Sequence, residues 1–372
     1  MNRNLVAAVA LASAILGVCA RAPAFAEKLV ISDALGRKVT VETPVKRVAL
    51  SFNFEEFSAV AGKEGWAKVI GISRALFAGW RPAIFSRYAA VIPNLQDMPD
   101  FGHTEDNSFS VEKVISLRPD VLFMSEWGWK AIESNRPQLE AAQIPVVIID
   151  YNAQLLDRHL ASTRAFGKVM GQEARAEEIA RVYESSYNDT MARIAKAQPA
   201  SKPSVYFELG QAGAETIGNS YSGTMWGKIA SLVGATNVAD GKLPGPWGPV
   251  SAEALIADDP TAIFIAGSSW VGKPKAVQTG YDATPEKTRA TLAPYAQRPA
   301  WSGLKAVKSG DVYAIEHGLC RSLQDFAATR YIAKALYPQA FADVDPAKEL
   351  ADFHNKYLPV PFSGTWFVRW KP

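Results

Sequence analysis

The apolar residues of this chain fall in short runs that alternate with helical patterns. Most runs are rich in Val, Ile and Leu and lack polar alternation, which is typical of strands buried on both faces of a parallel sheet. The runs occupy residues 47–50, 69–72, 121–124, 146–149, 205–209, 215–217, 262–266 and 311–315. Before them, the segments 29–33 and 38–42 flank a short turn and predict a β-hairpin. The pattern as a whole predicts an α/β fold.

The strand patterns stop between residues 150 and 199. Gly171 is expected to end one helix, and residues 173–197 are expected to form another, because apolar side chains recur there at helical spacing. At 1.5 Å per residue this helix is about 37 Å long, which is enough to cross from one lobe to another. It contains no internal Pro or Gly, so we expect no hinge and only a small closure of the lobes on ligand binding.

An internal repeat supports a division into two lobes. One copy begins at Ser110 (SVEKVISLRPDVLF) and the other at Ser251 (SAEALIADDPTAIF). The matching pairs are Glu112 and Glu253, Ile115 and Ile256, Pro119 and Pro260, Phe123 and Phe264, and Trp129 and Trp270. Each copy predicts a Ser-capped short helix, a turn and a buried strand. The expected order is a signal peptide at 1–26, an N-terminal lobe at 27–160, a helical segment at 161–198 and a C-terminal lobe at 199–372.

The N-terminus has the features of a secretory signal. Arg3 precedes an apolar run over residues 5–18, and Ala24-Phe25-Ala26 supplies the small residues that a signal peptidase recognises, so cleavage is expected before Glu27. The run is too short for a transmembrane anchor. A lipid anchor at Cys19 is the alternative, but the branched Val18 stands where a small residue is preferred. We therefore expect a soluble periplasmic protein.

Composition narrows the function classes. The 372 residues include 40 Lys and Arg against 37 Asp and Glu, with 48% hydrophobic and 21% charged residues, which fits a folded protein of two lobes. The net charge of +3 is small and evenly spread, which argues against a nucleic-acid binder. Cleavage would leave a single thiol, Cys320, so no disulfide framework is expected. Burial is the commoner fate of such a thiol.

The sequence lacks the common enzyme signatures. It contains no phosphate-binding P-loop, no G-x-G-x-x-G fingerprint, no H-E-x-x-H helix and no G-x-S-x-G nucleophile elbow. None of the four His residues is beside a recognisable nucleophile. We therefore expect a protein that is not an enzyme and has no intrinsic cofactor. An exported hydrolase is the less favoured alternative, since catalytic triads are defined by geometry rather than order.

Two histidines are candidate metal contacts. His103 lies in a loop and His317 follows a predicted strand, whereas His159 and His354 are expected to be structural or exposed. A bare zinc or manganese site needs several His and carboxylate ligands that converge, and these residues are scattered in the sequence. Ordinary loop hydrogen bonding by His103 and His317 therefore stays open beside metal coordination.

Aromatic and cationic residues gather at the predicted carboxyl ends of strands, where open α/β sheets bind ligands. The aromatic candidates are Trp80, Trp127, Trp129, Tyr221, Trp247 and Trp270. The cationic candidates are Arg74, Arg81 and Arg321. Trp129 and Trp270 match in the repeat, so we expect them to face one another across the ligand. Together these residues suit a flat, oxygen-rich anionic ligand.

The D-x-x-G-R hairpin, the S-x-E repeat, the long central helix and the segment WSGLKAVKSGDVYAI at 301–315 resemble periplasmic substrate-binding proteins of iron-siderophore, haem and cobalamin ABC importers. The resemblance implies two Rossmann-like lobes with mainly parallel sheets, joined by one long rigid helix, with the ligand between them. It also implies a monomer that meets an inner-membrane permease with its cytoplasmic ATPase. In that family an exposed Glu on each lobe docks onto the permease, and the matching positions are Glu112 and Glu253. The alternative role of each Glu is to complement its helix dipole.

The resemblance leaves the ligand open. A ferric siderophore is our first expectation. A nickel or cobalt chelate, haem and cobalamin are the alternatives, and His103 and His317 suit nickel better than ferric iron. The segment from residue 74 to 107 is long for the family, so ligand contacts do not transfer position by position.

Overall fold

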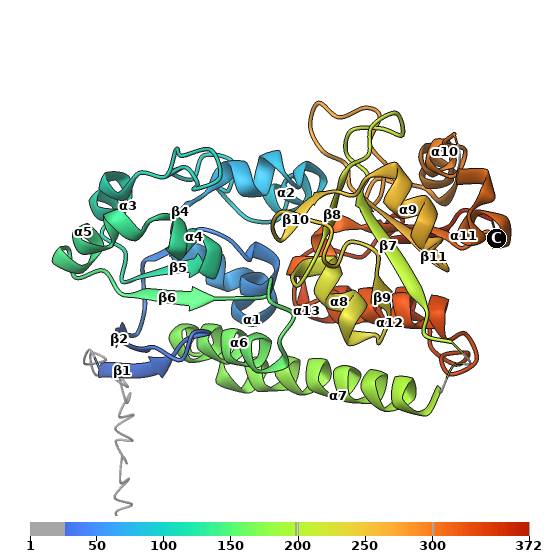
Figure 1. Cartoon of the computed structure of the whole chain (residues 1–372). Coiled ribbons are helices and arrows are strands. Elements are labelled where there is room, and N and C mark those ends of the chain that lie inside the picture. Colours follow the sequence, from blue (N-terminus) through green and yellow to red (C-terminus); the bar gives the residue numbers. More distant parts are fainter. Residues whose placement is uncertain (1–26, 198, 200, 300, 372) are drawn as a thin grey trace, which may run out of the picture.

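The computed structural model of the chain describes residues 27–197, 199, 201–299 and 301–371, and the expected signal peptide lies outside them. Two mainly parallel sheets stand side by side (Figure 1). The first is all parallel, with strand order β4-β3-β5-β6. Its strands are β3 (Val48–Leu50), β4 (Val69–Ile72), β5 (Val121–Ser125) and β6 (Val146–Ile149). All four expected strands of this sheet are confirmed.

The second sheet has the order β13-β12-β11-β7-β9, and only β13 is antiparallel. Its strands are β7 (Ser204–Leu209), β9 (Thr236–Asn237), β11 (Ala262–Gly267), β12 (Val312–Glu316) and β13 (Phe367–Arg369). A separate ribbon pairs β8 (Asn219–Tyr221) with β10 (Trp247–Pro249). The predicted hairpin is present as β1 (Glu27–Ser32) and β2 (Lys38–Thr43).

The predicted strand at 215–217 is wrong. Arg298, which is buried, donates to the carbonyl oxygens of Ala214 and Thr216 and forms a two-nitrogen ion pair with Glu208. Glu208 also accepts the backbone N–H of Gly218. Side chains therefore bind the backbone at Ala214, Thr216 and Gly218, and residues 215–217 join none of the described sheets.

Helices surround both sheets. Those near the first sheet are α1 (Phe54–Gly65), α2 (Pro82–Ala89), α3 (Val111–Leu117), α4 (Glu126–Ala131), α5 (Arg136–Ala141) and α6 (Leu156–Met170). Those near the second are α8 (Met225–Leu232), α9 (Ala252–Asp258), α10 (Pro285–Ala296), α11 (Lys305–Ser309), α12 (Asp325–Leu336) and α13 (Pro346–Tyr357). Short helical turns are η1 (Trp66–Lys68), η2 (Ala75–Gly79), η3 (Glu133–Asn135), η4 (Trp301–Gly303) and η5 (His317–Arg321).

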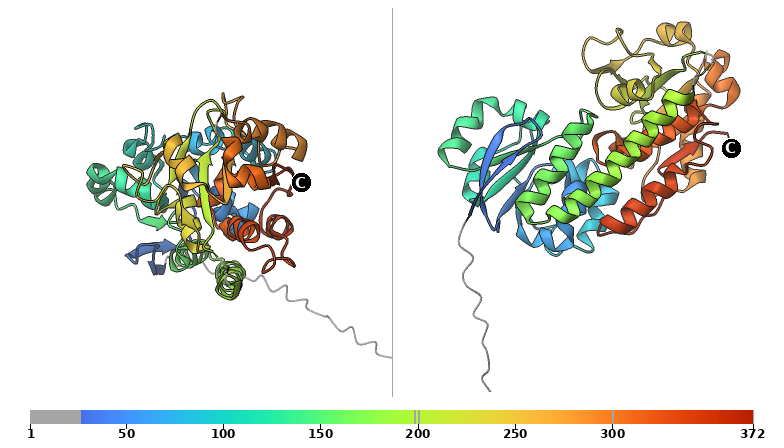
Figure 2. Two further views of the ribbon diagram at one scale, coloured as in Figure 1. Left: turned by 45° about the vertical axis from the view of Figure 1, so that its right-hand side comes forward. Right: turned by 90° about the horizontal axis from the view of Figure 1, so that it is seen from below.

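The predicted crossing helix is confirmed as α7 (Glu173–Ala197), which runs along one side of the molecule past both sheets (Figures 1 and 2). It packs against α6 at one end and contacts α12 farther along. Its buried face includes Ile179, Ala180 and Tyr183. No helix of the described residues is long and apolar enough to cross a membrane.

The capped helix, the turn and the strand of both repeat copies are confirmed. The Ser110 and Ser251 hydroxyls accept from the backbone N–H groups three residues later and cap α3 and α9. Both helices end in a left-handed residue, Arg118 in one and Asp259 in the other. After the strands the copies diverge, because β5 leads directly into helix α4 whereas β11 leads into a loop.

The core connects the two halves. One cluster of buried apolar side chains includes Leu50 of β3 and also Phe264 of β11 and Ile315 of β12. The expected lobe boundary at residue 160 falls inside α6, which contacts both α1 and α7. The shared cluster supports the expected small closure of the lobes, which stays a prediction.

Candidate functional site

Aromatic side chains gather where strands of the first sheet end. Phe52 follows β3, Trp127 lies in α4 after β5, and Trp80 lies between β4 and α2. The Phe52 ring meets the rings of Trp127 and Trp80 edge-on, with centroids 5.6 and 6.4 Å apart. The two indoles are inclined by 21° at a centroid distance of 6.4 Å. Both indoles are partly exposed, so this aromatic cluster has ring surface free to contact a ligand.

A guanidinium from the other half of the chain lies on the aromatic cluster. Arg321, in η5 after β12, places Cζ 4.8 Å from the Trp80 centroid and 6.0 Å from that of Phe52. Its buried Nε has no hydrogen-bond partner among the described residues, and no ion pair there includes this side chain. Burial lowers the pKa of Arg321. An anion placed beside it would therefore stabilise its charge.

His317 lies at the centre of a second aromatic group, after β12 of the second sheet. Its ring lies 5.9 Å from the rings of Tyr221 and Trp270, and its Nδ1 accepts the indole N–H of Trp226 at 3.2 Å. Burial, together with the charges of Arg321 and Arg81, lowers the pKa of His317 well below its usual value. The imidazole is therefore neutral, and because Nδ1 accepts, its proton is on Nε2. A protonated Nε2 suits hydrogen-bond donation rather than metal coordination.

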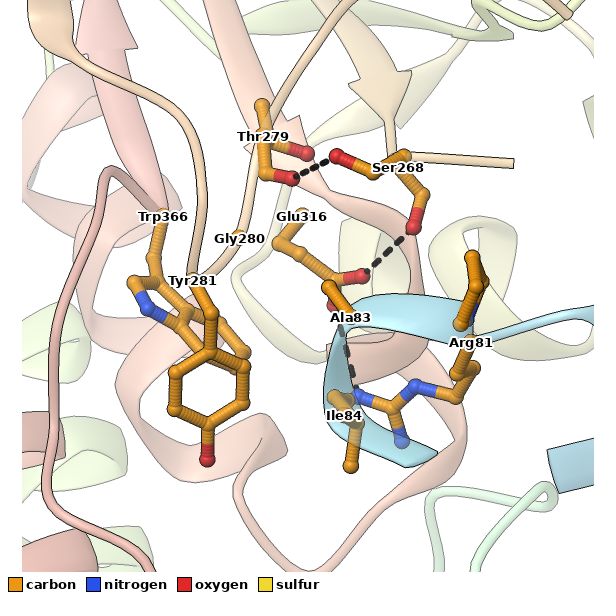
Figure 3. Close-up of a pocket in the computed structure, with 11 residues that line it drawn as sticks. Arg81, Ala83, Ile84, Ser268, Thr279, Gly280, Tyr281, Glu316 and Trp366 are labelled. Atoms are coloured by element: carbon orange, nitrogen blue, oxygen red, sulfur yellow. Dashed lines mark hydrogen bonds and ion pairs between the residues drawn. The ribbon is translucent and has the colours of Figure 1, made fainter. Parts of the chain in front are cut away.

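Arg81 occupies a different environment from Arg321. It leaves the start of α2 and reaches Glu316 at the end of β12 (Figure 3), at 3.8 Å, while another nitrogen pairs with Glu55 of α1. Burial tends to lower the pKa of Arg81, but the two carboxylates outweigh it and hold the pKa above its usual value. The charge of Arg81 is therefore neutralised within the protein.

Arg81 and Glu316 also line a small pocket between α2 and the ends of β11 and β12. Polar atoms of four residues in its wall are buried without hydrogen-bond partners among the described residues. They are Nε and Nη2 of Arg81, Oε2 of Glu316, Oγ1 of Thr279 and the hydroxyl of Tyr281. Burial raises the pKa of Glu316, although Arg81 partly opposes the shift.

His103 stays close to the aromatic cluster, with its ring 6.1 Å from that of Trp80. Its Nε2 lies 3.1 Å from an Asp106 oxygen, and its buried Nδ1 has no hydrogen-bond partner among the described residues. No group of three or more His, Cys, Asp or Glu side chains suited to a metal ion occurs in the part of the chain that the structure describes. The proposed metal role of His103 and His317 stays a prediction.

Two of the expected ligand contacts, Arg74 and Trp129, do not join the aromatic cluster in this structure, and their role in binding stays a prediction. Arg74 donates to the carbonyl oxygens of Gln96 and Met98, and so holds the segment after α2 in place. The Trp129 ring lies 4.8 and 4.4 Å from the guanidinium carbons of Arg37 and Arg136. Because α4 turns Trp129 away from the aromatic cluster into a separate core cluster, it does not share the surroundings of Trp270.

The remaining candidates lie at the rim or on the surface. Trp247 is 57% exposed and pairs with Tyr221 in the β8–β10 ribbon. Glu112 and Glu253 are both exposed in the first turns of α3 and α9. These two carboxylates therefore occupy equivalent positions at solvent-facing helix starts.

The sequence interpretation missed Phe52, Trp226, Glu55 and Glu316. Phe52 and Glu316 carry a usable signal, since each lies at or just after the carboxyl end of a predicted strand. Trp226 and Glu55 lie in helices, and their roles depend on partners far away in the sequence.

Comparison with known proteins identifies the family. Residues 85–317, more than half of the chain, match the family model described as periplasmic binding protein. The chain belongs to the periplasmic binding protein family. The solved TroA-like periplasmic binding protein FepB from Veillonella parvula is 35% identical, with a TM-score of 0.86, over 92% of this chain and 99% of that one. Members of this family are binding proteins of transport systems rather than enzymes, and work with a membrane permease and its ATPase.

Other relatives differ in their ligands. The molybdate-binding protein MolA of Haemophilus influenzae is 25% identical over 354 residues, which cover 88% of this chain and 90% of MolA. CeuE of Helicobacter pylori, solved as a Ni-His complex, is 18% identical with a TM-score of 0.60 over 90% of this chain and 96% of that one, which shows the fold alone. Family membership therefore does not fix the ligand of this periplasmic binding protein.

Proposed function

We propose that this periplasmic binding protein captures an anionic metal chelate, a ferric siderophore in the first place, and delivers it to an inner-membrane ABC permease. The observation that carries the proposal is the unpaired Arg321 guanidinium on the Trp80 ring. A half-buried cation without a carboxylate partner favours an anionic ligand. Ferric siderophores combine negative charge with flat, oxygen-rich donor groups, and they match both parts of this site.

The surrounding side chains divide the work of binding. Trp80, Trp127 and Phe52 offer aromatic surface to the flat parts of the chelate. Arg321 meets its negative oxygens, and the Nε2–H of His317 donates one hydrogen bond from the opposite side. In this arrangement the protein binds the organic ligand, and the metal keeps its own donor atoms.

Delivery requires contact with the permease. Glu112 and Glu253 are exposed at the starts of equivalent helices on the two halves of the chain. Two carboxylates presented in this way suit pairing with cationic side chains on a two-fold permease. The protein acts as a monomer in this proposal, and one molecule meets both permease subunits.

A small tetrahedral oxyanion is the second candidate. It is favoured by the likeness to the molybdate-binding protein over most of the chain. An oxyanion of this size needs one buried cation and a few donors, and it makes little use of three aromatic rings.

A panel of ligands tests the proposal. Ferric tris-catecholate, ferric citrate, nickel-histidine, haem, cobalamin and molybdate are titrated into the mature protein by calorimetry, and ligand that co-purifies from the native periplasm is identified by mass spectrometry. We expect at least one ferric chelate to bind in the micromolar range or tighter, and iron-free catecholate to bind more weakly. Tight molybdate binding without ferric-chelate binding would replace the first candidate by the second. Binding of haem or cobalamin alone would reject both.

A further inference from the structure

Gly318 and Arg81 meet in an unusually close contact between the two halves of the chain. A Cβ atom added at Gly318 would lie 2.6 Å from Arg81 Nη2, 2.7 Å from Cζ and 2.9 Å from Nε. These nearly equal distances place the face of the guanidinium directly against the glycine. Real Cβ atoms essentially never come this close to other heavy atoms, so only glycine leaves room for Arg81 in this position.

The contact depends on the side chain of Arg81 and not on a special backbone conformation. Gly318 is absent from the residues with positive φ, so alanine is compatible with its backbone. It lies in the short helical turn η5, where alanine would be favoured over glycine if nothing packed against it. The glycine is therefore explained by the guanidinium that lies on it.

The charges around Arg81 hold it in this position. Glu55 from α1 binds one end of the guanidinium and Glu316 from β12 faces the other. The side chains of both glutamates are 3% exposed and that of Arg81 is 14% exposed. Movement of Arg81 away from Gly318 would leave two buried carboxylates without their cation, which is strongly unfavourable.

The same contact lies beside the proposed ligand-binding side chains. Trp80 directly precedes Arg81, and Arg321 follows Gly318 by one turn of η5. Close by, Glu56 accepts from the Ser322 hydroxyl at 2.5 Å and from the Leu323 N–H at 3.0 Å, so α1, which also holds Arg81 through Glu55, is tied to the residues directly after Arg321. A change in the spacing of Arg81 and Gly318 would therefore alter the spacing of Trp80 and Arg321.

We propose that Gly318 is a positioning residue: it admits the Arg81 side chain between the two halves of the protein, and the Glu55–Arg81–Glu316 contact then fixes the distance between Trp80 and Arg321. This inference deepens the proposed function, because the Trp80–Arg321 pair is the proposed chelate contact. It assigns different roles to the two arginines. Arg81 sets the geometry of the site, and Arg321 meets the ligand.

The test is a double-mutant cycle with a matched control. Gly318→Ala is compared with Gly303→Ala, which alters another short helical turn where a Cβ would meet nothing within 4 Å. Each glycine change is made alone and together with Arg81→Lys, which keeps the positive charge but removes the flat guanidinium face. The measurements are amide hydrogen exchange at Leu323 without ligand, thermal unfolding, and the affinity for the ferric chelate that binds the parent protein.

We expect Gly318→Ala to speed exchange at Leu323 and to weaken chelate binding by roughly tenfold or more, while Gly303→Ala changes neither. In the Arg81→Lys protein, Gly318→Ala should add less than a twofold effect. Full additivity of the two changes, or unaltered exchange and affinity in Gly318→Ala, would overturn the inference. If no chelate binds the parent protein, the proposed function fails, and exchange in the ligand-free variants still decides whether Gly318 positions Arg81.

Discussion

Replacement of Arg321 by methionine should weaken ligand binding but leave the stability of the fold nearly unchanged or raise it. The guanidinium lies 4.8 Å from the Trp80 centroid, and its buried Nε is unpaired among the described residues. In the ligand-free protein the cation loses hydration and regains only a cation–π contact, worth about 0.5–2 kcal/mol. Methionine fills similar space without the charge. We therefore expect the free energy of unfolding to change by less than about 1 kcal/mol, or to rise.

The same change removes the charge that is proposed to meet the chelate. Loss of one partner from a buried, charged contact costs about 2–5 kcal/mol, which corresponds to a decrease in affinity of about 30-fold to several thousand-fold. Calorimetric titration with the ferric chelate gives the affinity, and urea unfolding gives the stability. Arg181→Met, on the exposed face of α7, is the control, and should leave affinity unchanged.

The outcome separates binding from structural roles. If Arg321→Met loses several kcal/mol of stability and keeps its affinity for the chelate, the guanidinium stabilises the fold and the proposed site is incorrect. If affinity falls and stability holds, the unpaired guanidinium is a ligand contact. Arg321→Lys should fall between methionine and the parent protein, because it restores the charge without the planar group.

Three further predictions follow from other parts of the molecule. Replacement of both Glu112 and Glu253 by Ala should abolish uptake through the permease and leave chelate affinity in solution unchanged; intact uptake would leave these residues as helix-dipole partners only. Burial, together with the charge of Glu55, raises the pKa of Glu56 above 4.5, so ionisation of Glu56 destabilises the folded protein as pH rises through the folded-state pKa. In urea unfolding, Glu56→Gln should therefore be as stable as the parent protein near pH 4 and more stable near pH 8. Equal stability of the two proteins at both pH values would contradict the shift. Chelate binding should quench Trp80 fluorescence, so Trp80→Phe should lose much of the quenching while Trp129→Phe keeps it; the reverse result would return Trp129 to the site.

The sheets could be predicted from the sequence because their strands are buried on both faces. Such strands must be continuously apolar, and the pattern at 121–124 or 262–266 therefore has few alternative explanations. The failed strand at 215–217 shows the opposite case. The carbonyl of Thr216 accepts from Arg298, which lies 82 positions farther along the chain. A local pattern contains no information about such a partner.

The candidate site could be predicted only in part, because it too depends on contacts between residues far apart in the sequence. The position of a residue after a strand indicates which edge of the sheet it approaches, and Trp80, Trp127 and His317 did gather at those edges. The direction of each side chain depends on the local structure that follows. Trp129 and Trp270 match in sequence, but one lies in a helix and the other in a loop, so their side chains have different neighbours.

The different proposed roles of the two arginines rest on their charge balance. Arg81 and Arg321 both lie at the junction of the two halves, and sequence alone offered the same role for both. Arg81 has two buried carboxylates, so an added anion would have to compete with them. Arg321 lies on aromatic rings and forms no ion pair among the described residues. Burial lowers its pKa, and the charge of Arg81 adds to that shift, whereas Cys320, Tyr221 and Glu316 oppose it. In the proposed site, a ligand anion would therefore gain more beside Arg321 than beside Arg81, and its charge would offset the desolvation of the Arg321 guanidinium.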